Sequence, residues 1–142
     1  MTVLYKKKVH AYVTREKEGV MQLLVFKHRD IPEAGIQIPG ETLEAALLRE
    51  VQEESGLRHL CIERFLADYI ILVKDKKEYQ KRHFFHVTLL TDVKDDWEHI
   101  VSAGEEDEGL VFCYEWIDIA KCPELAGKQG EFLHLLEEVY VQ

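Results

Sequence analysis

The sequence has few cysteines, and those that it has follow no recognisable pattern. Cys61, Cys113 and Cys122 are an odd number of thiols, and no C-x-x-C spacing occurs. Such a set indicates neither a disulfide framework nor a zinc site. We therefore expect a protein with reduced thiols, of the kind found in the cytoplasm.

Long apolar stretches are also missing. No run approaches the ~20 apolar residues that a membrane-spanning helix needs, so we expect no membrane partner. The first nine residues, M-T-V-L-Y-K-K-K-V, have no apolar core after their basic residues, as a secretory signal would have. Internal repeats and linker-like stretches are absent, and 142 residues with 46% hydrophobic and 32% charged side chains predict one globular domain over residues 1–142.

Positive charge is scarce relative to negative charge. Lysine and arginine together number 18, aspartate and glutamate number 27, and the formal net charge is −9. This balance argues against an extended nucleic-acid-binding surface. An anionic small molecule would also be repelled, so bound metal ions would have to supply much of the attraction for it.

The stretch over residues 35–57 is the most informative part of the chain: G-I-Q-I-P-G-E-T-L-E-A-A-L-L-R-E-V-Q-E-E-S-G-L. Its second half predicts an amphipathic helix from about Thr42, a plausible N-cap, to Ser55. Four apolar residues recur there at spacings of three and four: Leu43, Ala46, Leu47 and Val51. Gly56 can adopt the left-handed conformation that ends a helix, and Leu57 can fold back onto the last turn.

The charged residues of this predicted helix conflict with one another. Glu50 and Glu54 are four residues apart and share a face, and Glu53 lies beside them. Neighbouring carboxylates repel, and they crowd the C-terminal end of a helix, where the dipole favours cations. A hard divalent cation would remove this conflict, and Arg49, four residues before Glu53, could hold that carboxylate in one rotamer. A solvated acidic face is the simpler interpretation of these charges taken alone.

The spacing of these residues resembles the signature of the Nudix hydrolases. That signature is a glycine, five residues, a glutamate, seven residues and then R-E-U-x-E-E-x-G-U, where U is a bulky aliphatic residue. Nine positions of this chain match it within 23 residues: Gly35, Glu41, Arg49, Glu50, Val51, Glu53, Glu54, Gly56 and Leu57. The rest of the chain is compatible with a Nudix domain but matches less specifically.

The resemblance implies an activity and roles for the matching residues. A Nudix enzyme uses water to cleave the pyrophosphate of a nucleoside diphosphate linked to another group. Glu50, Glu53 and Glu54 would hold Mg²⁺, or Mn²⁺ in its place, to neutralise the phosphates and activate the water. One carboxylate would take the proton, and the sequence leaves open which one. Glu41 would support the metal ligands, and Arg49 would orient a carboxylate.

The loop before Glu41 is unusual for the family. Relatives typically have several residues between their first glycines and the final Gly-Glu, whereas here Ile38-Pro39-Gly40 is followed at once by Glu41. The match of Gly35 to the signature would then be a coincidence of spacing. Gly40 would be the functionally relevant glycine, and its backbone would face metal or phosphate. Two explanations remain: a genuinely shortened loop, or a chain from which loop residues have been omitted. We predict that residues 36–38 are extended and at least partly buried.

Apolar runs of alternating or β-branched residues predict about six strands around the helix. They lie at 7–14, 21–26, 35–39, 61–73, 83–90 and 110–119, with a hairpin turn at 16–19 and a bend near Ala67 and Asp68. A second helix is predicted over residues 131–140. Residues 74–81 and 91–109 are predicted to be polar connections. These elements predict an α+β protein with a mixed sheet, and the resemblance implies a Nudix-type α/β/α sandwich.

Residues outside the signature give weaker candidates. The acidic run at 105–108 is most simply a solvated loop, but some Nudix enzymes bring a further carboxylate to the metal from a distant loop, and Glu108 would be that ligand. His83 and His86 fall on opposite faces of one strand and cannot bind a metal together. Six aromatic residues could stack on a base: Tyr69, Tyr79, Phe84, Phe85, Trp97 and Trp116. For Phe84, Phe85 and Trp116, packing in the core is the simpler role.

Three functions compete at this point. The first is a Mg²⁺-dependent pyrophosphohydrolase acting on a small nucleoside diphosphate derivative, and a homodimer is compatible with it. The second is a non-catalytic Nudix-fold regulator that binds a nucleotide; the intact R-E-V-Q-E-E sequence argues against it. The third is an acidic interaction domain with a chance resemblance, and the nine spaced matches argue against it.

Overall fold

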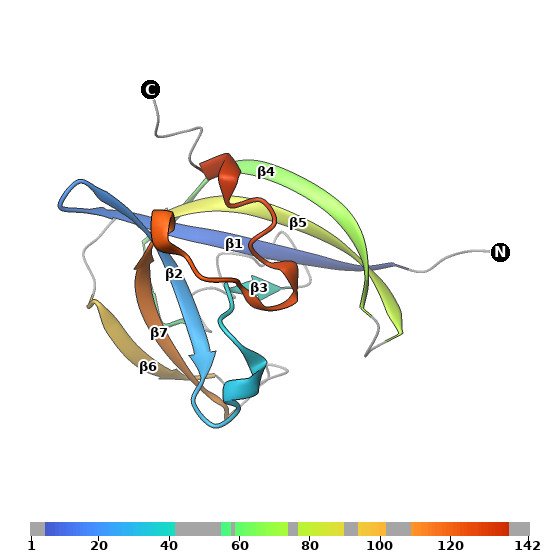
Figure 1. Ribbon diagram of the computed structural model, residues 1–142, viewed down its shortest axis with the longest axis horizontal. Coiled ribbons are helices and arrows are strands. Elements are labelled where there is room, and N and C mark those ends of the chain that lie inside the picture. Colours follow the sequence, from blue (N-terminus) through green and yellow to red (C-terminus); the bar gives the residue numbers. More distant parts are fainter. Residues whose placement is uncertain are drawn as a thin grey trace.

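The computed structural model describes residues 5–41, 55–57, 59–73, 77–89, 94–101 and 109–136. They form a seven-stranded mixed sheet in the order β4-β5-β1-β2-β7-β6, with the short β3 beside β1 (Figure 1). The strands are β1 Tyr5–Lys17, β2 Val20–His28, β3 Gly40–Glu41, β4 Leu60–Val73, β5 Glu78–Leu89, β6 Asp96–Ile100 and β7 Val111–Asp118. Short 3₁₀ helices are η1 Pro32–Ala34, η4 Ile119–Lys121 and η5 Ala126–Lys128. The mixed sheet predicted from the sequence is confirmed.

Strand β1 is the central element of the sheet. On one side it pairs in parallel with β5, from Tyr5 opposite Tyr79 to Thr14 opposite Thr88. On its other side it forms an antiparallel hairpin with β2, which turns at Glu18 and Gly19. The predicted turn at 16–19 is therefore confirmed, with β1 extending further into it than the sequence indicated.

Strands β1 and β2 separate away from their hairpin, and residues 37–41 fill the space between them. Gln37 exchanges two main-chain hydrogen bonds of 2.9 Å with Phe26 of β2. On the other side, the Ala11 N–H donates to the Pro39 carbonyl at 2.9 Å, and β3 continues along β1. Ile38 is 2% exposed, so the predicted burial is confirmed, although regular pairing is confined to Gln37 where a strand over 35–39 was predicted.

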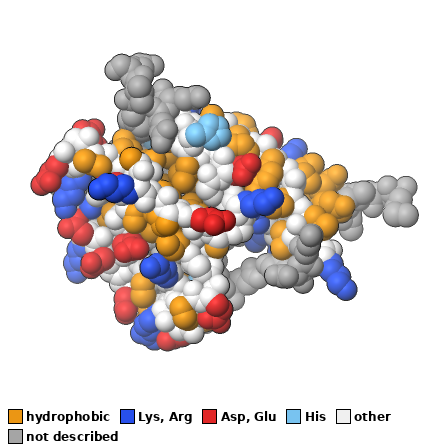
Figure 2. Space-filling view, viewed as in Figure 1, with side chains coloured by type: hydrophobic (Ala, Val, Ile, Leu, Met, Phe, Trp, Pro, Cys, Tyr) orange, Lys and Arg blue, Asp and Glu red, His pale blue; other side chains and the backbone are white. Residues whose placement is uncertain are grey.

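The sheet carries a buried apolar cluster on each face, because side chains alternate along its strands. The first cluster takes the odd-numbered residues of β1 and includes Leu57. The second includes Tyr12 from β1, with Leu125 and Leu136 from the chain after β7. That last stretch, with η4 and η5, runs across the β1–β2 face in Figure 1. In the same view, acidic and basic side chains are interspersed around exposed apolar ones (Figure 2).

Two polar connections predicted from the sequence contain strands. Strand β5 begins at Glu78, within the predicted turn 74–81, and β6 lies within the predicted excursion 91–109. Both segments alternate in burial, which a mixed polar composition conceals. Within the predicted helix 131–140, residues 131–133 form turns and only 134–136 are helical among the described residues. No helix in the described parts of the chain is long and apolar enough to cross a bilayer.

Candidate functional site

The structure describes the two anchors of the candidate metal site rather than the site's carboxylates. Arg49, Glu50, Glu53, Glu54 and Glu108 lie outside the described residues, and for Gly40 and Glu41 the structure describes the backbone. We call residues 42–54 the acidic segment, residues 36–41 its N-terminal anchor and residues 55–57 its C-terminal anchor. Both anchors are bonded to the sheet.

The N-terminal anchor is held mainly through its main chain. In β3, Gly40 lies opposite His10 and Glu41 opposite Val9, so consecutive residues follow β1 without interruption, as a shortened loop requires. The chain after β7 supports the anchor from outside. Gln129 Oε1 accepts a hydrogen bond of 2.7 Å from the Ile38 N–H.

A buried arginine secures that supporting chain to the sheet. Arg82, 8% exposed, donates from Nη1 to the Gly127 carbonyl at 2.5 Å and from Nε to Gln80 Oε1 at 3.1 Å. Tyr12 donates its hydroxyl to the Gln129 carbonyl at 2.6 Å. Side chains of β1 and β5 therefore hold the segment that in turn contacts the N-terminal anchor.

His10 lies in β1 beside Gly40 and is a neutral, buried imidazole. Its ring is stacked on Phe84, with centroids 5.1 Å apart, and among the described residues neither ring nitrogen has a hydrogen-bond partner. Burial, helped by the charges of Arg82 and Lys8, lowers the pKa of His10 from 6.5 to about 3. At neutral pH His10 therefore packs as an aromatic ring and carries no charge toward a substrate.

The C-terminal anchor ends the predicted helix as the sequence indicated. Ser55 is helical, Gly56 has a left-handed φ of 79°, and Leu57 is buried in the first apolar cluster. The Leu57 N–H donates to Ser55 Oγ at 3.2 Å. The predicted left-handed glycine is confirmed, whereas the turn onto which Leu57 was predicted to fold lies outside the described residues.

Two side chains of β6 meet this anchor. Trp97 donates its indole N–H to the Ser55 carbonyl at 2.6 Å. The His99 ring lies so close to Gly56 that a Cβ on Gly56 would be 3.1 Å from Nδ1. The sequence suggested Trp97 only as a base-stacking residue, and the alternation of Trp97 and His99 with Asp96, Glu98 and Ile100 was the available signal for a strand.

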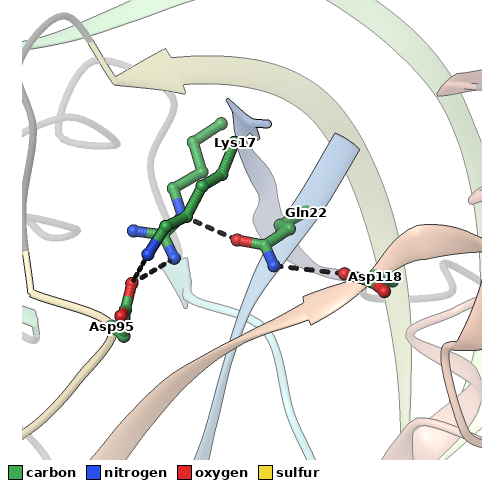
Figure 3. A network of polar contacts seen from close by, with 5 residues as sticks. Lys17, Gln22, Asp95 and Asp118 are labelled. Carbon is green, nitrogen blue, oxygen red and sulfur yellow. Dashed lines mark hydrogen bonds and ion pairs between the residues drawn. The ribbon is translucent and has the colours of Figure 1, made fainter. Parts of the chain in front are cut away.

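Strand β6 is itself fixed at its start by a network of ion pairs (Figure 3). Asp95 Oδ1 accepts from Lys17 Nζ at 2.6 Å and from Arg15 Nη2 at 2.7 Å. These two cations hold the pKa of Asp95 below its usual value. Arg15 also donates to Gln22, whose amide donates to Asp118 of β7, so the network joins β1, β2, β6 and β7.

The acidic run at 105–108 falls in the connection between β6 and β7. The two ends of this connection are bonded to each other, because Val101 donates to Leu110 at 3.0 Å and accepts from Gly109 at 3.1 Å. Val101 is buried in the same cluster as Leu57. The connection therefore starts and ends at the core that also receives the C-terminal anchor, while Glu108 itself stays outside the described residues.

The other candidate residues have structural surroundings. His86 is buried on the second face, with Nε2 2.7 Å from Thr14 Oγ1, and burial lowers its pKa. His83 lies on the opposite face, 3.9 Å from Asp68, as predicted. Phe84 and Trp116 are buried, which confirms packing roles for them. Within the described ranges, no group of three or more His, Cys, Asp or Glu side chains could hold a metal.

Comparisons with known proteins agree with this arrangement. The sequence model of the NUDIX domain family matches residues 4–136. A C. elegans Ap4A hydrolase aligns with a TM-score of 0.64 at 16% identity, over 97% of this chain and 100% of that one. The NUDIX domain of Shewanella oneidensis NrtR, complexed with ADP ribose, aligns with a TM-score of 0.66 at 13% identity, over 99% of this chain and 91% of that one. A MutT NUDIX hydrolase from Burkholderia pseudomallei aligns with a TM-score of 0.60 at 18% identity, over 90% and 96%. At these identities the likeness shows a shared α+β fold.

Proposed function

Because this chain belongs to the NUDIX domain family, we propose that it hydrolyses a pyrophosphate bond in a nucleoside diphosphate linked to another moiety. The observation that carries the proposal is the sequence R-E-V-Q-E-E at residues 49–54, which in the chain falls between two anchors that the sheet holds. A fold that fixes both ends of a carboxylate-rich segment is suited to positioning those carboxylates, and positioning is most of what phosphoryl transfer needs.

The donor set fits a hard divalent cation. Glu50, Glu53 and Glu54 offer carboxylate oxygens, which Mg²⁺ and Mn²⁺ prefer over nitrogen or sulfur. When bound, the metal ion supplies charge neutralisation for the phosphates and acidifies a water molecule. Arg49 would orient one of the glutamates, and Glu41, whose backbone is fixed in β3, would support the ligands.

The remaining steps belong to residues of the chain. A carboxylate of the acidic segment that is not engaged by metal would accept the proton of the attacking water. The backbone of Gly40 would face the phosphates, and Glu108 would add a carboxylate from the connection between β6 and β7. His10, neutral and buried, takes no proton in this scheme.

The structural neighbours support the choice of substrate class. One is an Ap4A hydrolase and another holds ADP ribose. Ap4A and ADP ribose each contain a nucleoside joined to a second group through a chain of phosphates. We therefore propose a small nucleotide of this kind as substrate, with the cut at a bond between two phosphorus atoms.

The test is a panel of nucleoside diphosphate derivatives assayed with Mg²⁺ and again with EDTA. We expect at least one member to be hydrolysed with Mg²⁺ and to be stable with EDTA. In H₂¹⁸O, phosphorus NMR should show one labelled phosphate per cleaved bond, because water attacks phosphorus. Hydrolysis that persists in EDTA, or label on carbon, would contradict the mechanism.

A second candidate function is nucleotide binding without turnover. It is favoured by the likeness to the NrtR NUDIX domain complexed with ADP ribose. The same panel separates the two functions when binding is followed by calorimetry. Tight binding of one member with no product formed would select the regulator.

A further inference from the structure

We propose that Trp97 and His99 of β6 are positioning residues that set the place of Glu53 and Glu54 for metal binding, an inference that rests on the proposed function. Both side chains contact the C-terminal anchor, which follows Glu54 directly in the sequence. Neither is expected to touch metal or substrate.

The Trp97 hydrogen bond acts on a group that a helix leaves unsatisfied. The last carbonyls of a helix have no partner within it and carry partial negative charge. The Ser55 carbonyl is such a group, and the Trp97 indole N–H reaches it at 2.6 Å. An N–H donor at this point offsets part of that negative charge.

Trp97 is rigid enough to define a position. Its ring is stacked on Tyr114 of β7, with centroids 5.3 Å apart and planes 11° from parallel. Tyr114 in turn packs on Phe26 of β2, at 5.2 Å. The ion pairs of Asp95 fix the residue just before β6 (Figure 3). A series of aromatic rings in contact thus connects β2 to the Ser55 carbonyl.

His99 fixes the same anchor from the side. A Cβ on Gly56 would lie 3.1 Å from His99 Nδ1, closer than nine in ten contacts of real Cβ atoms. A side chain at Gly56 would therefore require the His99 ring to move by a few tenths of an ångström. Trp97 resists movement along the hydrogen bond, and His99 resists movement toward β6.

The anchor is close enough to the carboxylates for these contacts to matter. Glu54 and Glu53 are one and two residues before Ser55, and consecutive Cα atoms are ~3.8 Å apart. Displacements of ~1 Å in a catalytic group are enough to cost ~100-fold in rate. Loss of a residue that orients a metal ligand typically lowers the affinity for the metal by ~10-fold to 100-fold.

The chain supplies a matched control, because it has only two tryptophans. Trp116 lies on β7 and is buried, and among the described residues its indole nitrogen has no hydrogen-bond partner. Trp97→Phe and Trp116→Phe are therefore the same chemical change, with and without loss of the bond to Ser55. We expect Trp97→Phe to raise the Mg²⁺ concentration at half-maximal activity by about tenfold and Trp116→Phe to leave it unchanged.

A measurement without substrate uses the same two variants. In Trp116→Phe the only remaining fluorophore of this type is Trp97, and we expect its emission to change as Mg²⁺ or Mn²⁺ is added. In Trp97→Phe the emission of Trp116 should stay constant over the same titration. Hydrolysis absent in the wild-type protein would refute the proposed function, while the emission of Trp97 would still report on metal binding at the anchor.

Two results would overturn the inference. One is a folded Trp97→Phe protein whose metal requirement equals that of Trp116→Phe. The other is a Trp97 emission that ignores saturating Mg²⁺ in a protein that hydrolyses its substrate. If Trp97→Phe does not fold, His99→Ala keeps the ring stack and should raise the metal requirement several-fold; an unchanged value would reject the role of β6.

Discussion

The two anchors of the acidic segment are held by different means. The N-terminal anchor lies between two strands and is bonded to both through its main chain. The C-terminal anchor is met by side chains, the indole of Trp97 and the ring of His99. A main-chain contact survives most substitutions, whereas a side-chain contact is lost with one. We therefore expect the position of the proposed metal-binding carboxylates to be more sensitive to substitution of residues that contact the C-terminal anchor than of residues that contact the N-terminal anchor.

The largest effect should come from the segment between the anchors. Glu53→Gln or Glu54→Gln removes a metal ligand but also relieves repulsion between carboxylates. We expect kcat to fall by several orders of magnitude while the melting temperature is kept or rises, measured by steady-state kinetics and thermal unfolding. A variant with near-normal activity, or one that unfolds, would contradict the role of Glu53 and Glu54 as metal ligands.

The next effect concerns the glycine of the C-terminal anchor. Gly19 and Gly56 share a φ of 79°, but a Cβ on Gly19 would meet nothing within 4 Å, while one on Gly56 would meet His99. Gly19→Ala should cost ~1–2 kcal/mol of unfolding free energy for its left-handed backbone. Gly56→Ala should cost more and should also raise the Mg²⁺ requirement.

His99→Ala separates the two causes. In the double variant with Gly56→Ala, the contact with the ring is gone and only the backbone cost remains. In urea, the loss of unfolding free energy caused by Gly56→Ala should then be smaller in the His99→Ala background and closer to the loss caused by Gly19→Ala. Equal costs for the two single glycine variants would mean that His99 gives way without resistance, and the comparison of anchors would weaken.

Much of this arrangement is visible in the sequence, because burial and helix spacing are local signals. Strands β2 and β7 are apolar runs, and the left-handed Gly56 followed by Leu57 is a local stop signal. The carboxylates of the acidic segment are likewise recognisable from spacing alone.

The parts that local patterns miss are those made by distant partners. The polar first half of β5 is a strand because β1 lies beside it in parallel. Strand β6 is five residues long and carries two carboxylates, and it is a strand because β7 pairs with it. Trp97 and Ser55 are 42 residues apart, so no spacing rule joins them.

A pH dependence of stability should mark the N-terminal anchor. The pKa of His10 falls from 6.5 to about 3 on folding, so between these values the unfolded chain binds the proton and the folded protein does not. The contribution of neutral His10 to the unfolding free energy is therefore complete above pH 6.5. It is lost as the pH falls toward 3, by about 1.4 kcal/mol per pH unit.

His10→Phe keeps the ring on Phe84 and removes the titration. The variant should unfold in urea with a flatter pH dependence between pH 6 and pH 4, and at pH 7 it should be at least as stable as the wild type. A slope equal to that of the wild type would show that His10 is accessible to protons in the folded state.

The smallest effect should come from the ion pairs at the start of β6. Asp95→Asn removes the charge that Lys17 and Arg15 contact, at an exposed position. Because the pKa of Asp95 is lowered on folding, its contribution is present at neutral pH and is lost as the pH falls through the folded pKa. We expect the melting temperature of the variant to be slightly below that of the wild type at pH 7, and this difference to shrink as the pH is lowered. High salt should shrink the difference at pH 7, and a difference that persists in salt would speak against an ionic cause.

The parallel pairing of β1 with β5 has a consequence for how the chain is made. Thr14 and His86, joined across this pair, are 72 residues apart, so the first strand synthesised waits for a partner that is synthesised much later. At ~5–20 residues per second, β5 follows β1 out of the ribosome by roughly 4 to 15 s. Throughout that interval the partly apolar β1 has an open edge on the side that β5 will take. Nascent chains of this protein should therefore be bound by chaperones, and they should be most prone to mispairing, until residue 88 has been released.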